Sequence, residues 1–133
     1  MALSGRWRRA LGAAATLLVA TALLIAPAAA ERIHGTAKAD RLHGGARSDR
    51  LSGRAGADRL SGRKGDDLLK GGADGDKLIG GSGFDTLIGG PGDDFISARD
   101  GEGDQIECGD GYDRVVVDET EEGVFDCEEV IEP

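Results

Sequence analysis

The chain repeats a nine-residue pattern over much of its length. Cut after every ninth residue, residues 35–97 become the units GTAKADRLH, GGARSDRLS, GRAGADRLS, GRKGDDLLK, GGADGDKLI, GGSGFDTLI and GGPGDDFIS. One extra residue, Ala98, interrupts the count, and RDGEGDQIE and CGDGYDRVV then complete nine units over residues 35–116. A fixed period of this length indicates small structural units that bury a continuous core by stacking on their neighbours.

Two positions of the unit never change in type. The sixth is always aspartate, at Asp40, Asp49, Asp58, Asp67, Asp76, Asp85, Asp94, Asp104 and Asp113. The eighth is always a branched aliphatic residue, at Leu42, Leu51, Leu60, Leu69, Leu78, Leu87, Ile96, Ile106 and Val115. Glycine occupies position one in the first seven units and is frequent at positions two and four.

Each unit predicts a tight turn followed by a short strand. Glycine reaches backbone angles that other residues avoid, so GGxGxD suits a turn with its carbonyls facing inward. The last three residues then form a strand whose middle side chain, at position eight, alone points to the core. We therefore expect an all-β solenoid with two repeats per turn, or eighteen residues per rung.

The pattern resembles the haemolysin-type, or RTX, calcium-binding nonapeptide repeat, G-G-x-G-x-D-x-U-x, in which U is a large aliphatic residue. The resemblance covers residues 35–116, and the segment ARDGEGDQIECGDGYDRVVVD is also similar to small exported calcium-binding proteins of actinobacteria. Members of the family fold as a parallel β-roll, so the resemblance implies Ca²⁺ ions between turns on adjacent rungs. Turn carbonyls and position-six aspartates would hold these ions.

The calcium ligands that this resemblance implies fall into two groups. The aspartates are Asp49, Asp58, Asp67, Asp76, Asp85, Asp94, Asp104 and Asp113. The turn glycines are Gly65, Gly72, Gly81, Gly83, Gly90 and Gly92.

The charge of the repeats points to calcium independently. Stacking alternate units places the aspartates in two columns, with rungs about 4.8 Å apart. Carboxylates facing one another at that spacing repel by roughly 1 to 3.5 kcal/mol at effective dielectrics between ~80 and ~20. A hard dication ringed by oxygen atoms removes this repulsion, and calcium tolerates a pliable set of ligands better than magnesium does. The alternative, an Asx-turn residue that merely closes a glycine turn, suits one aspartate better than nine in register.

The core of such a solenoid is thin. One inward aliphatic residue per nine residues contributes little burial against the entropy lost when the chain is ordered. We therefore expect the chain to be loose without metal and to fold when calcium binds.

The first four units depart from the family pattern. Side chains replace glycine at position two (Thr36, Arg54 and Arg63) and at position four (Lys38 and Arg47). We expect them to displace the turn that aims the carbonyls. Arginine directly follows the first three aspartates, and residues 35–70 carry a net charge of +4 against −8 for residues 71–116.

From this contrast we expect arginine to soften the first rungs of the aspartate columns. Firm calcium sites would then begin at unit four. The strongest pairings would be Asp67 with Asp85 and Asp76 with Asp94.

The two ends of the chain differ from the repeats. Three arginines, an apolar run from Ala10 to Ala26 and the small residues PAAA at 27–30 predict a secretory signal peptide over residues 1–30, with an uncleaved anchor helix as the alternative. Cleavage leaves 13 basic and 25 acidic side chains, a net charge of about −12, on a protein that we expect to be secreted and not inserted in a membrane.

Residues 31–116 then form the calcium-binding β-roll, and residues 117–133 an acidic C-terminal cap. The only two cysteines, Cys108 and Cys127, lie in the exported part, where a disulfide can form and persist. Such a bond would pin the cap onto the last rung and cover the open edge of the sheet. Two free thiols are the alternative.

No enzyme motif is present. The sequence contains no HExxH, G-x-S-x-G or Walker motif, and DGEGD at 100–104 lacks the full spacing of an EF-hand loop. An acidic chain also repels nucleic acid. We expect a secreted calcium-binding protein that is not an enzyme, with calcium-dependent self-association or cell-surface adhesion as the alternative.

Overall fold

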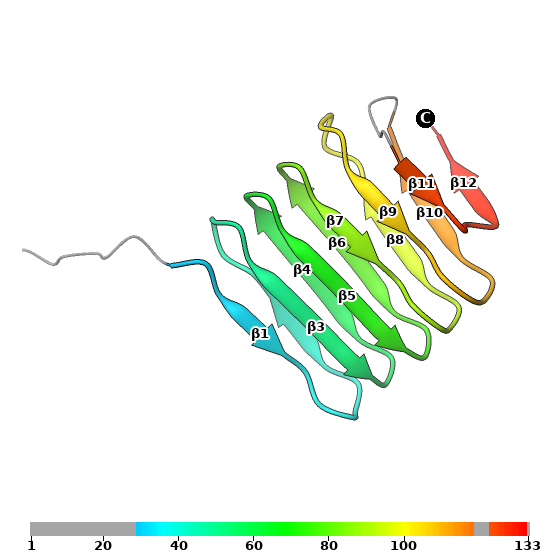
Figure 1. The fold of residues 1–133 in the computed structure, drawn as a ribbon, viewed down its shortest axis with the longest axis horizontal. Helices are drawn as coiled ribbons and strands as arrows, with labels where there is room; N and C mark the ends of the chain where they lie inside the picture. Colours follow the sequence, from blue (N-terminus) through cyan, green and yellow to red (C-terminus); the bar gives the residue numbers. More distant parts are fainter. Residues whose placement is uncertain (1–28, 119–122, 133) are drawn as a thin grey trace, which may run out of the picture.

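The chain winds into a flattened β-solenoid. The computed structural model describes residues 29–118 and 123–132, which contain twelve short strands and no helix. Successive coils stack from β1 at one end to β12 at the other (Figure 1). The predicted signal peptide falls almost entirely outside the described residues, and within them no helix is long and apolar enough to cross a membrane.

The strands form two parallel six-stranded sheets that face each other. Odd-numbered strands make one sheet: β1 (Arg32–His34), β3 (Arg50–Ala55), β5 (Leu68–Ala73), β7 (Thr86–Ile88), β9 (Gln105–Glu107) and β11 (Gly123–Phe125). Even-numbered strands make the other: β2 (Arg41–His43), β4 (Arg59–Lys64), β6 (Lys77–Ser82), β8 (Phe95–Ala98), β10 (Arg114–Val117) and β12 (Glu129–Ile131).

The register confirms two repeats per turn. Leu51 pairs with Leu69 in one sheet, and Leu42 pairs with Leu60 in the other, so each residue lies beside the residue eighteen positions later. The separation becomes nineteen where Leu87 pairs with Ile106, because the chain has gained one residue at unit eight. The predicted parallel β-roll is therefore confirmed.

Three positions of each unit point inward. The position-eight aliphatic residues are buried in one continuous core, as predicted. The position-six aspartates from Asp49 to Asp113 are also buried, with 3 % or less of their surface exposed. Within positions seven to nine only position eight is buried, as predicted, but burial of the aspartate at position six was not expected. Side chains alternate along a strand, so positions six, eight and one of the next unit share a face.

Glycine at position one makes room for the buried carboxylate. A Cβ atom on Gly71 would overlap the Oδ2 atom of Asp76 and would lie 2.7 Å from the carbonyl oxygen of Gly89 on the next rung. The same two obstacles, an aspartate oxygen and a carbonyl one rung away, meet a Cβ at Gly53 and Gly62. Position one is thus restricted by packing, and its φ is not left-handed.

Replacing Gly71 by alanine should therefore destabilise the solenoid strongly. Real Cβ contacts at these distances do not occur, so both the Asp76 carboxylate and the next rung must shift, at a cost of about 1–3 kcal/mol or more. Gly45→Ala is the matched control, because a Cβ at Gly45 meets its nearest atom, Asp49 Oδ2, at 3.6 Å. Urea unfolding in saturating calcium compares them, and equal midpoints would contradict the packing argument.

The extra residue of unit eight lies in its turn. Ala98 is fully buried at the end of β8 and pairs with Val117, which places it in the inward slot that glycine fills elsewhere. The turn from Arg99 to Gly103 is consequently one residue longer than the others. Counting Ala98 as an interruption between units was therefore wrong.

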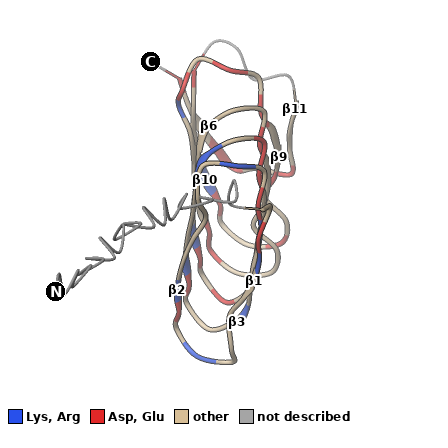
Figure 2. Cartoon of the chain, turned by 90° about the vertical axis from the view of Figure 1, so that its left-hand side faces the viewer, with Lys and Arg blue, Asp and Glu red and all other residues tan. Residues whose placement is uncertain are grey.

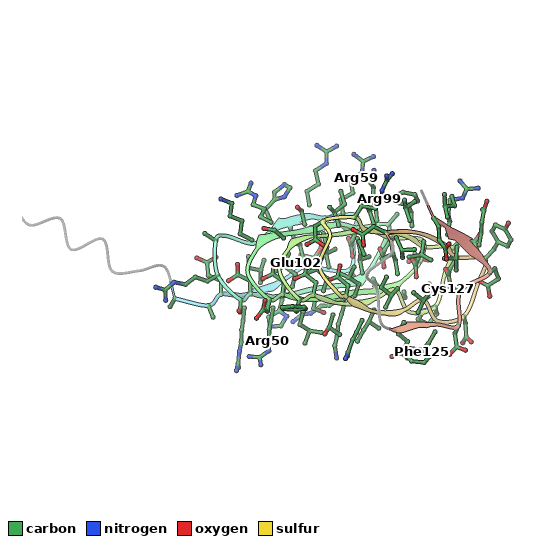
Figure 3. The ribbon with its side chains drawn as sticks, turned by 90° about the horizontal axis from the view of Figure 1, so that it is seen from above. Arg50, Arg59, Arg99, Glu102, Phe125 and Cys127 are labelled. Carbon is green, nitrogen blue, oxygen red and sulfur yellow. A yellow bond between two sulfur atoms is a disulfide. The ribbon has the colours of Figure 1, made fainter. Side chains whose placement is uncertain are left out.

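The C-terminal tail extends the solenoid by one more coil. β11 pairs with β9 and β12 pairs with β10, both in parallel, so the tail covers the edges of both sheets. Cys108 and Cys127 form the predicted disulfide, and Figure 3 places Cys127 at the end of the stack beside Phe125. The tail repeats no sequence pattern, so its two strands were not predicted. Residues 119–122 of its acidic loop lie outside the described part.

Removing the disulfide should loosen this last coil. Cys108→Ala with Cys127→Ala should lower the free energy of unfolding by about 3 kcal/mol, because the bond closes a loop with a sequence separation of 19. Alanine fits the inward slot at 108, as Ala98 does in the equivalent slot half a turn earlier. Denaturant unfolding of the oxidised protein and the double variant measures the difference. Unchanged stability would show that pairing of β11 and β12 holds the tail without the bond.

Candidate metal sites

The buried aspartates form two hydrogen-bonded ladders. In each ladder the Oδ1 atom of one aspartate accepts the backbone N–H of the aspartate one rung earlier. The bonds join Asp40 to Asp58, Asp49 to Asp67, Asp58 to Asp76, Asp67 to Asp85, Asp76 to Asp94, Asp85 to Asp104 and Asp94 to Asp113, at 2.6–2.8 Å. One oxygen of each carboxylate is thus fixed between rungs.

The second oxygen of most of these carboxylates has no partner. The buried Oδ2 atom accepts no hydrogen bond in Asp58, Asp67, Asp76, Asp85, Asp94, Asp104 and Asp113. A buried acceptor without a partner costs about 1–3 kcal/mol, and more when it carries charge. Seven such atoms in two regular columns are not accidental defects of packing. Carboxylate oxygens are ligands of calcium, so the donor set fits this ion.

Most turns share one backbone conformation. Positions two and four both have positive φ in units three to seven and in unit nine. The predicted turn glycines all belong to this set, with φ of 97° at Gly65, 116° at Gly72, 111° at Gly81, 123° at Gly83, 104° at Gly90 and 138° at Gly92. These turns stack backbone on backbone: a Cβ on Gly90 would lie 2.5 Å from the carbonyl oxygen of Gly72 one rung earlier.

Two arginines that were expected to displace the turn do not. Arg54 has φ of 83° and Arg63 has φ of 84°, so both adopt the left-handed conformation that glycine adopts at position two of later units. This conformation is unfavourable for residues with a Cβ. The expectation was wrong for units three and four. It holds only for units one and two, where no residue has a positive φ.

Units one and two satisfy their carboxylates locally. Asp49 Oδ2 accepts the backbone N–H of Gly45 at 2.6 Å. Asp40 Oδ2 accepts the N–H of Thr36 at 2.6 Å and its hydroxyl at 2.8 Å, and these bonds lower the pKa of Asp40. Both aspartates therefore close their own turns, as in the alternative that the sequence analysis left open, but the N–H group they accept lies four residues earlier and the motif is not an Asx-turn.

Arginine does not soften the aspartate columns. Arg41, Arg50 and Arg59 are exposed, and Figure 3 shows Arg50 and Arg59 projecting from opposite faces of the solenoid. Position seven points outward because position six points inward. In the described residues no ion pair joins an arginine to a position-six aspartate. That prediction was wrong: turn N–H groups satisfy the second oxygen of Asp40 and Asp49, and the second oxygen of Asp58 has no partner.

Burial makes the later carboxylates hard to ionise. It raises the pKa of Asp85 and Asp94 from 3.8 to about 7, and that of Asp67, Asp76 and Asp104 to about 6. Neighbouring carboxylates raise these pKa values further, and the N–H bond from the earlier rung opposes the rise in each case. The pKa of Asp113 is raised for the same reasons. A bound cation would favour the charged form of these groups.

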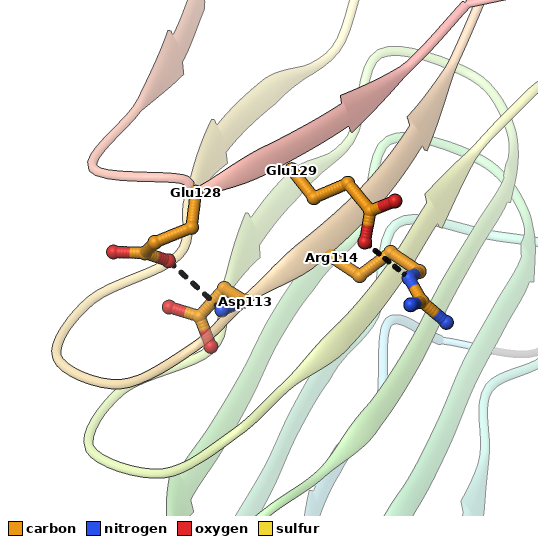
Figure 4. A network of polar contacts seen from close by, with 4 residues as sticks. All are labelled: Asp113, Arg114, Glu128 and Glu129. Carbon is orange, nitrogen blue, oxygen red and sulfur yellow. Dashed lines mark hydrogen bonds and ion pairs between the residues drawn. The ribbon is translucent and has the colours of Figure 1, made fainter.

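Sequence reasoning missed two acidic residues at these ladders. Glu128 Oε2 accepts the backbone N–H of Asp113 at 2.8 Å, so the tail supplies the acceptor that the next repeat would have supplied (Figure 4). Beside it, Arg114 Nε donates to Glu129 Oε2 at 2.7 Å.

Asp100 is the second missed residue. It lies with Asp85 and Asp104, with one ligand atom of each within 4.8 Å of the others. The acidic sequence DGEGD at 100–104, which contains Asp100 and Asp104, was the feature that could have indicated this residue.

The comparisons with known proteins decide the family. The model of the RTX calcium-binding nonapeptide repeat matches the chain four times, at residues 34–69, 43–78, 70–104 and 79–115. The chain belongs to this family. RTX repeats bind Ca²⁺, so the protein is a calcium-binding repeat protein with a β-roll fold. No match was found among curated proteins or among solved structures.

Proposed function

We propose that this RTX protein is exported and that its solenoid forms when calcium fills the spaces between stacked turns. The observation that carries the proposal is the row of buried Oδ2 atoms without hydrogen-bond partners. A chain that needed its aspartates only to close turns would satisfy them as units one and two do, with turn N–H groups. The unpartnered Oδ2 atoms of the later units are therefore the proposed calcium ligands.

The pattern of unpartnered oxygens supports five calcium sites. Asp58, Asp76, Asp94 and Asp113 enclose three spaces in one column, and Asp67, Asp85 and Asp104 enclose two in the other. The spaces that involve Asp40 and Asp49 are excluded, because the Oδ2 atoms of these residues are already bonded. Sites then begin at unit three, one unit earlier than the sequence indicated. Asp49 is not a ligand in this proposal.

Isothermal titration tests the proposal with the protein produced from the full chain. Calcium should bind with a stoichiometry near five and with heat from folding, while magnesium should produce much less of either, because it retains its waters and demands octahedral geometry. A chain that binds no calcium, or binds both ions alike without a change in structure, would contradict the proposal.

Export is supported by the disulfide and by the sequence of residues 1–30. Cys108 and Cys127 are joined, and such bonds persist in oxidising compartments outside the cytosol. Mass spectrometry of the secreted protein tests the boundary: an N-terminus at Glu31 is expected, and a retained segment 1–30 would contradict cleavage.

The charge distribution supports calcium-dependent assembly as a second candidate function. Lys and Arg lie on the segments around β2 and β3 (Figure 2), where Arg41 pairs with Arg59 and Arg59 with Lys77 in adjacent strands. Like charges opposite one another on adjacent strands repel, and an acidic surface on a partner would reduce this repulsion. The tail, residues 117–133, carries a net charge of −8 and would supply the acidic groups. Size-exclusion chromatography with and without calcium tests it: a concentration-dependent oligomer supports assembly, and a monomer contradicts it.

A further inference from the structure

The expanded turn of unit eight differs from every other described turn of the solenoid. It has one more residue than the others, and only Gly101, with φ of 83°, is left-handed, where most other turns have two left-handed positions. Nothing lies within 4 Å of a Cβ built on Gly101, so this turn also lacks the backbone stacking seen at Gly90 and Gly92. Its backbone cannot present the same carbonyl arrangement to an ion.

A carboxylate takes the place of this backbone arrangement. Asp100 Oδ1 accepts the N–H of Glu102 at 2.9 Å, which fixes the side chain, while its Oδ2 is buried and has no partner. Asp100, Asp85 and Asp104 place one oxygen each within 4.8 Å of the others. Asp85 and Asp104 are 2 % and 0 % exposed, and the Oδ2 atom of each also lacks a partner.

Further acidic side chains hold the expanded turn in position. Glu102 Oε2 accepts the N–H of Gly83 in the turn of unit six, one rung earlier. Asp118 Oδ2 accepts the N–H of Gly101 at 2.5 Å from the segment after β10. The turn is thereby anchored to both neighbouring coils, so the three inner carboxylates are held together before an ion arrives.

We propose that Asp85, Asp100 and Asp104 form a three-carboxylate cation site that fills first and that favours trivalent over divalent hard cations. The proposal rests on the calcium-binding function proposed above, and it concerns a ligand, Asp100, that lies outside the repeat pattern. In the described residues no other three acidic groups approach one another this closely. Ligand charge sets calcium affinity, and a third negative charge strengthens attraction to a trivalent ion more than to a divalent one.

The test compares Asp100→Asn with Asp110→Asn in the protein produced from the full chain. Asn at 100 keeps an Oδ1 acceptor for Glu102 N–H but loses the charge. Asp110 is an exposed aspartate of the next turn, so its substitution removes an equal charge outside the site. Calcium is titrated by calorimetry, and terbium(III) by its direct luminescence with calcium as competitor.

We expect Asp100→Asn to weaken the first calcium-binding event roughly tenfold and the first terbium event by more, while the later sites still fill. Asp110→Asn should leave the first event unchanged. Identical first events in the two variants would overturn the inference while leaving the proposed function intact. Loss of every site in Asp100→Asn would also overturn it, because Asp100 would then be required for folding. Absence of calcium binding in the unmodified protein would overturn the proposed function itself.

Discussion

Replacing Asp94 by asparagine is expected to stabilise the calcium-free protein and to destabilise the calcium-bound one. Asparagine retains an Oδ1 acceptor for the N–H of Asp76, which bonds Asp94 at 2.7 Å. It removes the charge of an Oδ2 atom that is buried without a partner. Without calcium we expect a gain of about 1–3 kcal/mol in the free energy of unfolding. With calcium we expect a larger loss, because Asp94 borders two of the proposed sites.

Asp93→Asn is the matched control for this prediction. Asp93 is the preceding residue, is exposed, and accepts the N–H of Tyr112 at 2.9 Å on the outside of the turn. Circular dichroism in chelator at pH 5, which measures the folded fraction of each variant, and urea unfolding in saturating calcium give the four comparisons. If Asp94→Asn lowered stability equally in the two conditions, Asp94 would be a structural turn residue and not a ligand.

Acid is expected to stabilise the calcium-free solenoid. Five buried carboxyl groups have a pKa of about 6 or 7 in the folded protein, against 3.8 as the ordinary value. The folded state therefore binds more protons than the unfolded state between about pH 4 and pH 7, and stability falls as pH rises through this interval. The destabilisation is fully present above pH 7. A difference of a few kcal/mol between pH 5 and pH 8 is expected after allowance for solvent screening.

Calcium should reverse the sign of this pH dependence. The ion binds the ionised carboxylates, so protons compete with it, and calcium affinity should fall as pH decreases from 7 to 5. The folded fraction in chelator, followed by circular dichroism at pH 5, 6, 7 and 8, and denaturant unfolding with calcium at the same pH values test both slopes. Parallel curves that both rise with pH would show that the buried aspartates are stabilised by protein groups and need no cation.

The repeat made most of the fold predictable. Period nine fixes eighteen residues per rung, and Leu42 pairs with Leu60 as that count requires. Aspartate at every sixth position identified the ladder, and the later turn glycines have the positive φ that their position demands. Each of these features is set within one unit and repeated, so local reasoning applied once is correct many times.

Features set by contacts between units were less predictable. The inward direction of position six followed from strand alternation, but the aspartates had been assigned to turns. The hydrogen bond to Asp49 Oδ2 comes from Gly45, whose φ is not positive. Glycine at position two of units five to seven has a positive φ, so the residue type alone does not predict which conformation a turn adopts. Tolerance of Arg54 and Arg63 in left-handed conformation reflects stacking on neighbouring turns, which overrides local preference.

The tail and the expanded turn lay beyond the repeat altogether. β11 and β12 carry no repeat signature, and their pairing is set by the edges of β9 and β10 and by the disulfide. Ala98 occupies the inward position that glycine occupies in other units, so the extra residue lies in the turn. This arrangement places Asp100 close to Asp85 and Asp104. The extra residue therefore added a carboxylate beside Asp85 and Asp104, while Asp104 kept its place in the ladder.

Far-ultraviolet circular dichroism during calcium titration tests the central claim, that calcium between the turns makes the solenoid. The protein, with its disulfide intact, is titrated from chelator with calcium and separately with magnesium. We predict a coil-like spectrum in chelator that becomes a strand spectrum with calcium and stays coil-like with magnesium. A strand spectrum already present in chelator at pH 8, and unchanged by calcium, would contradict the claim and show that the solenoid is stable on its own core.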